Sequence, residues 1–227
     1  METELNTKTS QERAIAEKTG VEPKGRIDRE DRREMILDVA SDIFLKEGYA
    51  SASMSTIAAR LGGSKGTLYN YFKSKEELFA AYVQRHCEFH RGQVGQLLLE
   101  EGEARTVLTH FARRYLRVFT TEQTLQNWRV ISAESAKSPE MGRLFYESGP
   151  LQGARLLANY LQKAVDRGEL KIEDTMRAAH QLTSLIHGRM IKARLLNYLP
   201  VPTDEEINAE VDSAMFVFFA AYAVNRD

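Results

Sequence analysis

Apolar residues recur at the 3.6-residue spacing of a helix along most of this 227-residue chain, and no proline interrupts residues 24–138. The five prolines lie at positions 23, 139, 150, 200 and 202, and no stretch alternates β-branched and polar residues. Proline interrupts helices, and a period of 3.6 gathers apolar side chains on one helical face, so the pattern favours helices over strands. We therefore expect an all-α fold.

The domain organisation follows from where this periodicity begins and ends. Residues 1–27 have low hydrophobicity and no apolar period, so we expect a disordered tail there. Residues 28–75 begin with a helix that Asp28 caps and Gly48 ends, and two short helices follow it. Residues 76–227 form a larger region. Its first expected helix runs from the start of this region to about Arg91. The others cover 104–120, 123–136, 139–148, 151–167, 173–197 and 204–224.

The formal charge of the whole chain hides an uneven distribution. With 31 basic and 32 acidic residues the net charge is −1, which by itself disfavours a nucleic-acid-binding protein. Residues 24–75, however, carry 10 basic and 7 acidic residues, a formal charge of +3. Residues 76–227 carry 18 basic and 20 acidic residues, a charge of −2. The sequence thus places a positive segment beside a mildly acidic one.

Several features bound the location of the protein in the cell. The lone cysteine, Cys87, cannot close a disulfide within the chain. The N-terminal residues lack the apolar segment of a signal peptide, and the longest apolar run, 214–224, falls short of the ~20 residues that span a membrane. We expect a cytoplasmic protein without membrane association.

The segment 53–75 carries the clearest functional signal. Two short helices joined by a turn at Gly62-Gly63 are typical of a helix-turn-helix. Between Arg60 and Lys75 there are four basic residues and no acidic one, and polar residues with two tyrosines at 69–71 lie between apolar Leu68 and Phe72. A helix that enters the major groove of DNA needs this combination of cations, hydrogen-bonding side chains and a buried anchor.

These residues resemble the tetracycline-repressor (TetR) family of bacterial transcription regulators over about 50 residues from Arg29. The resemblance is carried by Gly48-Tyr49, Ile57-Ala58, Ser64 to Tyr69 with Tyr71-Phe72, and Ser74 to Leu78. It implies a three-helix DNA-binding domain over 28–75. By resemblance, the residues that contact phosphates are Ser53, Tyr69 and Lys75. Those that face the major groove are Lys65, Gly66, Thr67, Asn70 and Tyr71, with Ser64 at the start of the same helix.

Residues 128–150 resemble the regulatory domain of a subgroup of this family that includes efflux-pump regulators. In that subgroup the domain houses a cavity for a small-molecule effector. The resemblance makes five aromatic residues candidates for its lining: Phe89, Phe111, Tyr115, Trp128 and Phe145. The alternative for each is an ordinary core residue, because aromatic residues at helical spacing mostly fill cores.

The last expected helix points to a second copy of the chain. Residues 214–224 are apolar all round, so a helix over them needs burial on every side. Burial in a homodimer satisfies this need, and the family resemblance implies dimerisation through two C-terminal helices. The candidates are the helices over 151–167, 173–197 and 204–224. A two-fold dimer would bind double-stranded DNA at a near-palindromic operator.

The sequence holds no signature of an enzyme. It lacks a phosphate-binding loop, a nucleophile elbow and a metalloprotease motif, so we expect neither catalysis nor a cofactor. His86 and His90 are spaced to share a helix face with Cys87 beside them, which leaves a metal sensor or metal-dependent enzyme as the alternative. The resemblance instead implies a ligand-responsive transcriptional repressor, released from its operator by a small-molecule effector.

Overall fold

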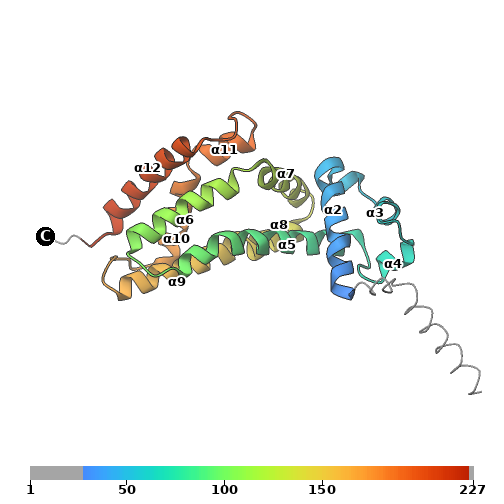
Figure 1. Ribbon diagram of the computed structural model, residues 1–227, viewed down its shortest axis with the longest axis horizontal. Helices are drawn as coiled ribbons and strands as arrows, with labels where there is room; N and C mark the ends of the chain where they lie inside the picture. Colours follow the sequence, from blue (N-terminus) through green and yellow to red (C-terminus); the bar gives the residue numbers. More distant parts are fainter. Residues whose placement is uncertain (1–27, 225–227) are drawn as a thin grey trace, which may run out of the picture. The chain divides into compact units, whose positions relative to one another are not determined.

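The structure is a computed structural model that describes residues 28–224, so the expected disordered tail over 1–27 lies outside the described residues. Within 28–224 every regular element is a helix, as Figure 1 shows, and strand-like pairing is limited to an isolated bridge between Leu170 and Ala223. The all-α prediction is confirmed. The periodicity alone was sufficient for it because nearly every long apolar segment repeats at the helical period.

Local capping sets the boundaries of the N-terminal helices. The first described helix, α2, spans Arg29–Ser51, but Gly48 has a φ of 79° and a non-helical backbone there, as expected of a residue that ends a helix. Serine residues begin each of the next three helices by accepting a hydrogen bond from a main-chain N–H in the first turn. These helices are α3 (Met54–Arg60), α4 (Lys65–Tyr69) and α5 (Lys75–Gly95).

The larger region follows the expected order of helices with two differences. It comprises α6 (Ala104–Phe119), α7 (Glu122–Ser135), α8 (Pro139–Ser148), α9 (Pro150–Asp166), α10 (Thr175–His187), α11 (Met190–Leu195) and α12 (Asp204–Tyr222). The sequence did not predict the short 3-10 helix η1 (Gln96–Leu99). The single helix expected over 173–197 is wrong: it divides into α10 and α11 at Gly188, whose φ of 42° lies outside the helical region.

The core of the larger region lies among α6, α9, α10 and α12. Its fully buried side chains include Leu108, Leu116, Leu161, Leu182 and Phe218. These helices pack in pairs, α9 against α10 and α6 against α12, as Figure 1 shows. The core thus ties the last helix of the chain to a helix about one hundred residues earlier.

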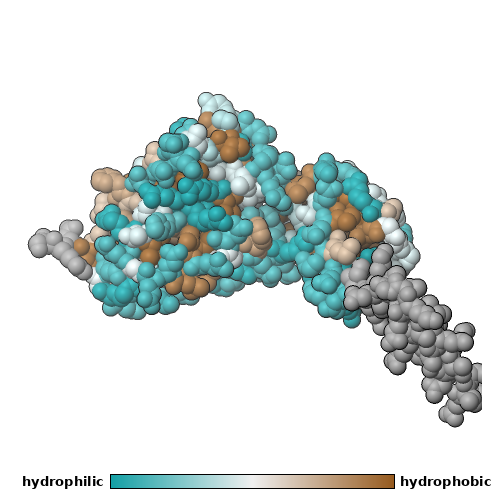
Figure 2. Space-filling view, in the orientation of Figure 1, coloured by the Kyte–Doolittle hydropathy of each residue, from teal (hydrophilic) through white to brown (hydrophobic). Residues whose placement is uncertain are grey.

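One face of α12 is not covered by this core. Met215, Phe218 and Phe219 are buried, whereas Phe216 is 75% exposed and Val217 is 48% exposed. Hydrophobic residues also interrupt the hydrophilic surface elsewhere in the helical region (Figure 2). Within a single chain, the expectation that this helix is buried on all sides is therefore not met. No helix among the described residues is both long enough and apolar enough to cross a bilayer.

Candidate DNA-binding helix and effector cavity

A small apolar core holds α3 and α4 in place. Ile57 from α3, Leu68 from α4 and Phe72 just after it are at most 2% exposed. On the neighbouring helices, the ring of Phe44 in α2 meets that of Phe79 in α5 edge-on, with centroids 5.1 Å apart. Because Leu68 and Phe72 point into the core, the residues between and before them are left on the surface of α4 and its C-terminal turn.

Most of the candidate DNA-binding residues are exposed. Thr67, Tyr71 and Lys75 are partly buried, and the exposed ones are Ser53, Ser64, Lys65, Gly66, Tyr69 and Asn70. Ser53 and Ser64 also cap helices: each hydroxyl accepts a hydrogen bond from a main-chain N–H, at 3.0 and 3.2 Å. Either hydroxyl could still donate its own hydrogen to a phosphate oxygen.

Two of the four basic residues of segment 60–75 are already engaged. The ammonium of Lys75 donates to the main-chain oxygens of Tyr49 and Ala52, at 2.9 and 3.0 Å, and lies over the ring of Tyr49. Arg60 pairs with Asp42 and Glu47 of α2. Within the described residues, no ion pair involves Lys65 or Lys73. The free positive charge of this surface therefore comes from these two lysines.

The larger region encloses an aromatic cavity of about 260 Å³. Its walls come from α5, α6, α7, α8, α9 and α10. Four of the five candidate effector residues line it together: Phe111, Tyr115, Trp128 and Phe145. Phe89 does not line it, and its side chain is 61% exposed. We call this space the effector cavity.

Several other ring-bearing side chains line the effector cavity, and Phe119 and His187 are two that the sequence did not predict. Phe119 lines the cavity, and its ring centroid lies 4.3 Å from that of Tyr115, on which it stacks, and 6.2 Å from that of Trp128. The ring of His187 contacts the rings of Tyr115 and Trp128. The spacing of Phe111, Tyr115 and Phe119 at i, i+4 and i+8 was the available signal for Phe119. No comparable signal existed for His187, which comes from α10.

Three of the histidines that line the effector cavity are uncharged near neutral pH. Burial lowers the pKa of His86 to about 3 and the pKa values of His90 and His187 to about 4. The hydroxyl of Tyr115 and Nε2 of His187 lie 2.6 Å apart, within hydrogen-bond distance. Burial also raises the pKa of the Cys87 thiol to about 12, so this cysteine is not a thiolate near neutral pH.

The possible metal site does not form. The rings of His86 and His90 meet edge-on at 4.3 Å, and Cys87 lies against the main-chain oxygen of Phe145. Across residues 28–224, no group of three or more histidine, cysteine, aspartate or glutamate side chains is arranged to hold a metal ion. The two imidazoles thus belong to the wall of the effector cavity rather than to a set of ligands.

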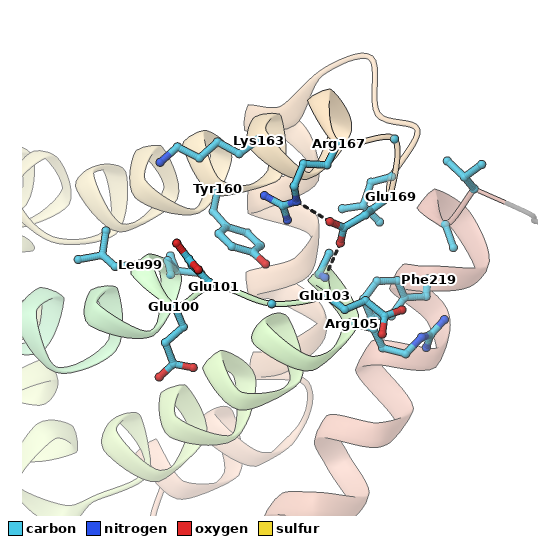
Figure 3. A pocket seen from close by; sticks show the side chains of 17 residues that line it. Leu99, Glu100, Glu101, Glu103, Arg105, Tyr160, Lys163, Arg167, Glu169 and Phe219 are labelled. Carbon is cyan, nitrogen blue, oxygen red and sulfur yellow. Dashed lines mark hydrogen bonds and ion pairs between the residues drawn. The ribbon is translucent and has the colours of Figure 1, made fainter.

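A second, wider hollow of about 1000 Å³ lies at the ends of α6, α9 and α12 (Figure 3). Some of its charged groups already have partners. Glu169 pairs with Arg167 and accepts from the main-chain N–H of Ala104, and Arg105 lies over the ring of Phe219 at 4.1 Å. Because this hollow is open and seven of the 17 residues that line it are charged, it is less suited than the effector cavity to enclose a small apolar molecule.

Three consecutive residues of α7 connect the effector cavity to helices on either side. Asn127 accepts a hydrogen bond from the hydroxyl of Tyr82 in α5. Trp128 lines the cavity, and the guanidinium of Arg129 donates to the main-chain oxygens of Arg194 and Leu195 in α11. A shift of α7 would therefore alter contacts with both α5 and α11.

Two family models match the chain. Residues 36–82 match the model described as bacterial regulatory proteins of the tetR family. Residues 106–224 match the model described as the C-terminal domain of AefR-like transcriptional repressors. The first match covers the helix-turn-helix, and the second covers α7 to α12 with nearly all of α6.

Known regulators resemble the chain over different lengths. The repressor ComR of Escherichia coli is 28% identical over 71% of this chain and 79% of its own length. The activator FasR of Mycolicibacterium smegmatis is 46% identical, but the match spans only 28% of this chain and 29% of FasR. The solved structure of the flavonoid-responsive regulator FrrA superimposes with a TM-score of 0.74 and is 34% identical, covering 86% of this chain and 98% of FrrA. Together with the helix-turn-helix geometry, these matches establish that the chain belongs to the TetR family of DNA-binding transcription regulators.

Proposed function

We propose that this regulator represses transcription by holding its operator through α4, and that a small molecule in the effector cavity releases it. The observation that carries the proposal is the surface around α4. There, buried Leu68 and Phe72 leave a lysine, a tyrosine and an asparagine exposed and a second tyrosine partly exposed, in a segment without acidic residues. Such a surface matches the phosphate and base contacts that a recognition helix makes.

The proposed contacts divide by chemistry. Ser53, Tyr69 and Lys75 would hold phosphates, with Lys75 using the donor that its two main-chain hydrogen bonds leave over. The residues proposed to face the major groove are Ser64, Lys65, Gly66, Thr67, Asn70 and Tyr71. Residues 28–75 would act as the DNA-binding domain and 76–227 as the effector-binding and dimerisation domain.

Repression is favoured by the C-terminal part of the chain. The matching model of residues 106–224 describes repressors, and ComR, which matches over most of its length, is a repressor. The activator FasR matches over only 63 residues, which leaves most of FasR without a counterpart here. The response to an effector is supported by FrrA, whose name describes a flavonoid-responsive regulator.

We propose that two copies pair through the uncovered face of α12, with α10 beside it. Phe216 and Val217 are exposed in the single chain, and pairing would bury them. A two-fold dimer would then present two copies of α4 to successive major grooves, ~34 Å apart.

The effector would act through α7. A ligand that contacts Trp128 would favour one position of this helix over another. Because Asn127 is hydrogen-bonded to Tyr82, a shift of α7 would also shift α5. Because α5 follows directly on the helix-turn-helix, the ligand-bound state would hold the two recognition helices at an unsuitable spacing. The effector can shift this equilibrium only by its difference in affinity for the two states.

A gel-shift assay with the DNA upstream of the protein's own gene tests the DNA-binding part. We expect Lys65→Ala and Tyr71→Ala to weaken binding at least about tenfold, as the loss of a base or phosphate contact does. Lys163→Ala, on α9 and remote in sequence from the helix-turn-helix, is the control and should bind normally. Normal sequence-specific binding by both α4 variants would refute the assignment of the recognition surface.

A further inference from the structure

The walls of the effector cavity are rich in aromatic rings. Tyr115 stacks on Phe119 at 4.3 Å, Phe119 is 5.5 Å from the His90 ring, and Trp128 is 6.1 Å from the His187 ring. Aromatic rings pack most favourably on other rings in stacked or edge-on arrangements. A planar aromatic molecule therefore fits these walls better than a flexible chain.

His90 lines the effector cavity and carries an unpaired polar atom. Its side chain is 9% exposed, and its Nδ1 atom is buried without a hydrogen-bond partner in the described part of the chain. A buried polar atom without a partner costs free energy, and a ligand that pairs with it recovers that cost. The neighbouring ring of His86 meets His90 edge-on and does not supply the partner.

The chemistry of a neutral imidazole defines what can pair with it. Burial keeps His86, His90 and His187 uncharged near neutral pH, since it lowers the pKa of each well below 7. A neutral ring nitrogen is either a donor or an acceptor, depending on the tautomer. A hydroxyl can donate and accept, so it suits Nδ1 in both tautomers, and the hydrogen-bonded pair of Tyr115 and His187 offers a second such position.

The same cavity offers few groups that could stabilise a charged ligand. Among the side chains that line it, the guanidinium of Arg91 is the charged group, and one of its nitrogens already donates to the main-chain oxygen of Ser148 at 2.9 Å. Burial keeps His86, His90 and His187 neutral, and moving a carboxylate from water into such surroundings costs far more than moving a hydroxyl.

We propose that the effector cavity binds an uncharged, planar aromatic molecule that carries a hydroxyl group, and that His90 pairs with this hydroxyl. The inference rests on the proposed effector role of the cavity and adds the class of ligand and the residue that selects it. His90 sets specificity, whereas Phe119 and Tyr115 provide the stacking surface.

Calorimetric titration of the full-length protein with naphthol, naphthalene and naphthoate tests the class of ligand. The three share one ring system and differ in carrying a neutral hydroxyl, no polar group or a carboxylate. Below the pKa of the phenol, we expect naphthol to bind about tenfold more tightly than either of the others, the gain typical of one satisfied hydrogen bond. Equal affinities for naphthol and naphthalene would overturn the proposal, and so would the absence of binding by all three.

Two substitutions assign the role of His90. His90→Phe should weaken the binding of naphthol about tenfold and change the affinity for naphthalene by less than about twofold. His90→Gln keeps a donor and an acceptor, so it should restore part of the lost naphthol affinity. His110→Phe makes the same change at an exposed position of α6 that does not line the cavity, so it is the matched control and should bind as the parent does. Naphthoate that binds as tightly as naphthol, with a loss in Arg91→Gln, would show a carboxylate site instead.

The same titrations on the complex with operator DNA separate the two proposals. Naphthol that binds through His90 and also releases the DNA supports both of them. Naphthol that binds through His90 without releasing DNA supports the class of ligand and refutes the effector role of the cavity. Release of DNA by naphthol at full strength in His90→Phe would support the effector role and refute the part given to His90.

Discussion

The hydroxyl of Tyr82 in α5 donates a hydrogen bond to Oδ1 of Asn127 in α7, and both side chains are at most 3% exposed. Asn127 also donates to the main-chain oxygen of Gln123 at 2.7 Å, so its amide is held on two sides. Burial raises the pKa of Tyr82 above its ordinary value, which keeps the phenol protonated as a donor. This bond joins the helix after the DNA-binding segment to the helix that carries Trp128.

Removing the donor of this bond should destabilise the protein. In Tyr82→Phe the oxygen of Asn127 loses its partner in a buried place, so we expect the free energy of unfolding to fall by about 1–3 kcal/mol in urea denaturation. Tyr146→Phe, whose side chain is 51% exposed, should change it by less than about 0.5 kcal/mol. Unchanged stability in Tyr82→Phe would show that the bond contributes nothing.

Lys75 should matter for the stability of the DNA-binding segment as well as for its charge. Its ammonium caps the end of α2 through the oxygens of Tyr49 and Ala52, so Lys75→Met leaves both oxygens without their cationic donor. We expect the free energy of unfolding to fall by about 1–2 kcal/mol. This is less than the cost of removing a fully buried hydrogen-bond donor, because the side chain is partly exposed. Lys73→Met removes the same charge from an exposed position and should be nearly neutral for unfolding. Equal effects in the two variants would argue against a capping role.

The histidines of the effector cavity should make stability depend on pH. Their pKa values in the folded protein, about 3 for His86 and about 4 for His90 and His187, lie below the value of ~6.5 in an unfolded chain. As the pH falls from ~6.5 to ~4, the unfolded state takes up protons first. The free energy of unfolding should therefore decrease, by at most ~1.4 kcal/mol per pH unit for each histidine.

Denaturation curves at a series of pH values check this dependence. His90→Gln and His187→Gln each remove one titrating group and should flatten the decrease between pH ~6.5 and ~4. His110→Gln, at an exposed position of α6, serves as the control and should leave the slope as it is. A parent protein whose stability stays constant across this window would contradict the buried, neutral state of these rings.

The sequence predicted the DNA-binding segment better than the effector cavity. The DNA-binding segment is formed by residues close together in the sequence, whereas the cavity is formed by residues far apart in it. Ser53, Ser64 and Ser74 mark helix starts within a few residues of the turns they cap, and the structure places a helix after each. The cavity gathers residues from six helices, and His187 reaches it only through the packing of α10. Local patterns do not contain that information.

Two features ran against general expectation. A glycine within a helical pattern is usually tolerated, so Gly188 gave no clear sign that it would separate α10 from α11. Arg194 is only 5% exposed although arginine is mostly a surface residue. Its guanidinium donates to the main-chain oxygens of Thr120 and Leu199 and pairs with Glu122, partners that only the folded chain brings together.

Gly188 should be intolerant of a side chain. Its φ of 42° and ψ of −138° suit glycine alone, so Gly188→Ala should lower the free energy of unfolding by about 1–2 kcal/mol. The added methyl would also meet the carboxylate of Glu210, a flexible group that can move aside, so backbone strain dominates the cost. Gly92→Ala, in the last turn of α5 with open space around it, should instead be neutral or stabilising by up to about 1 kcal/mol. Equal losses in both variants would contradict this account.

The exposed face of α12 should determine the oligomeric state. Phe216 is 75% exposed and lies beside Val217 on the same uncovered surface, so Phe216→Arg would place a charge at the centre of the proposed dimer contact. We expect this variant to sediment as a monomer where the parent sediments as a dimer. We also expect it to lose at least about tenfold in operator affinity, since one copy reaches one half-site. Leu99→Arg, at a side chain 78% exposed in η1, should remain dimeric. A dimeric Phe216→Arg would place the contact elsewhere on the chain.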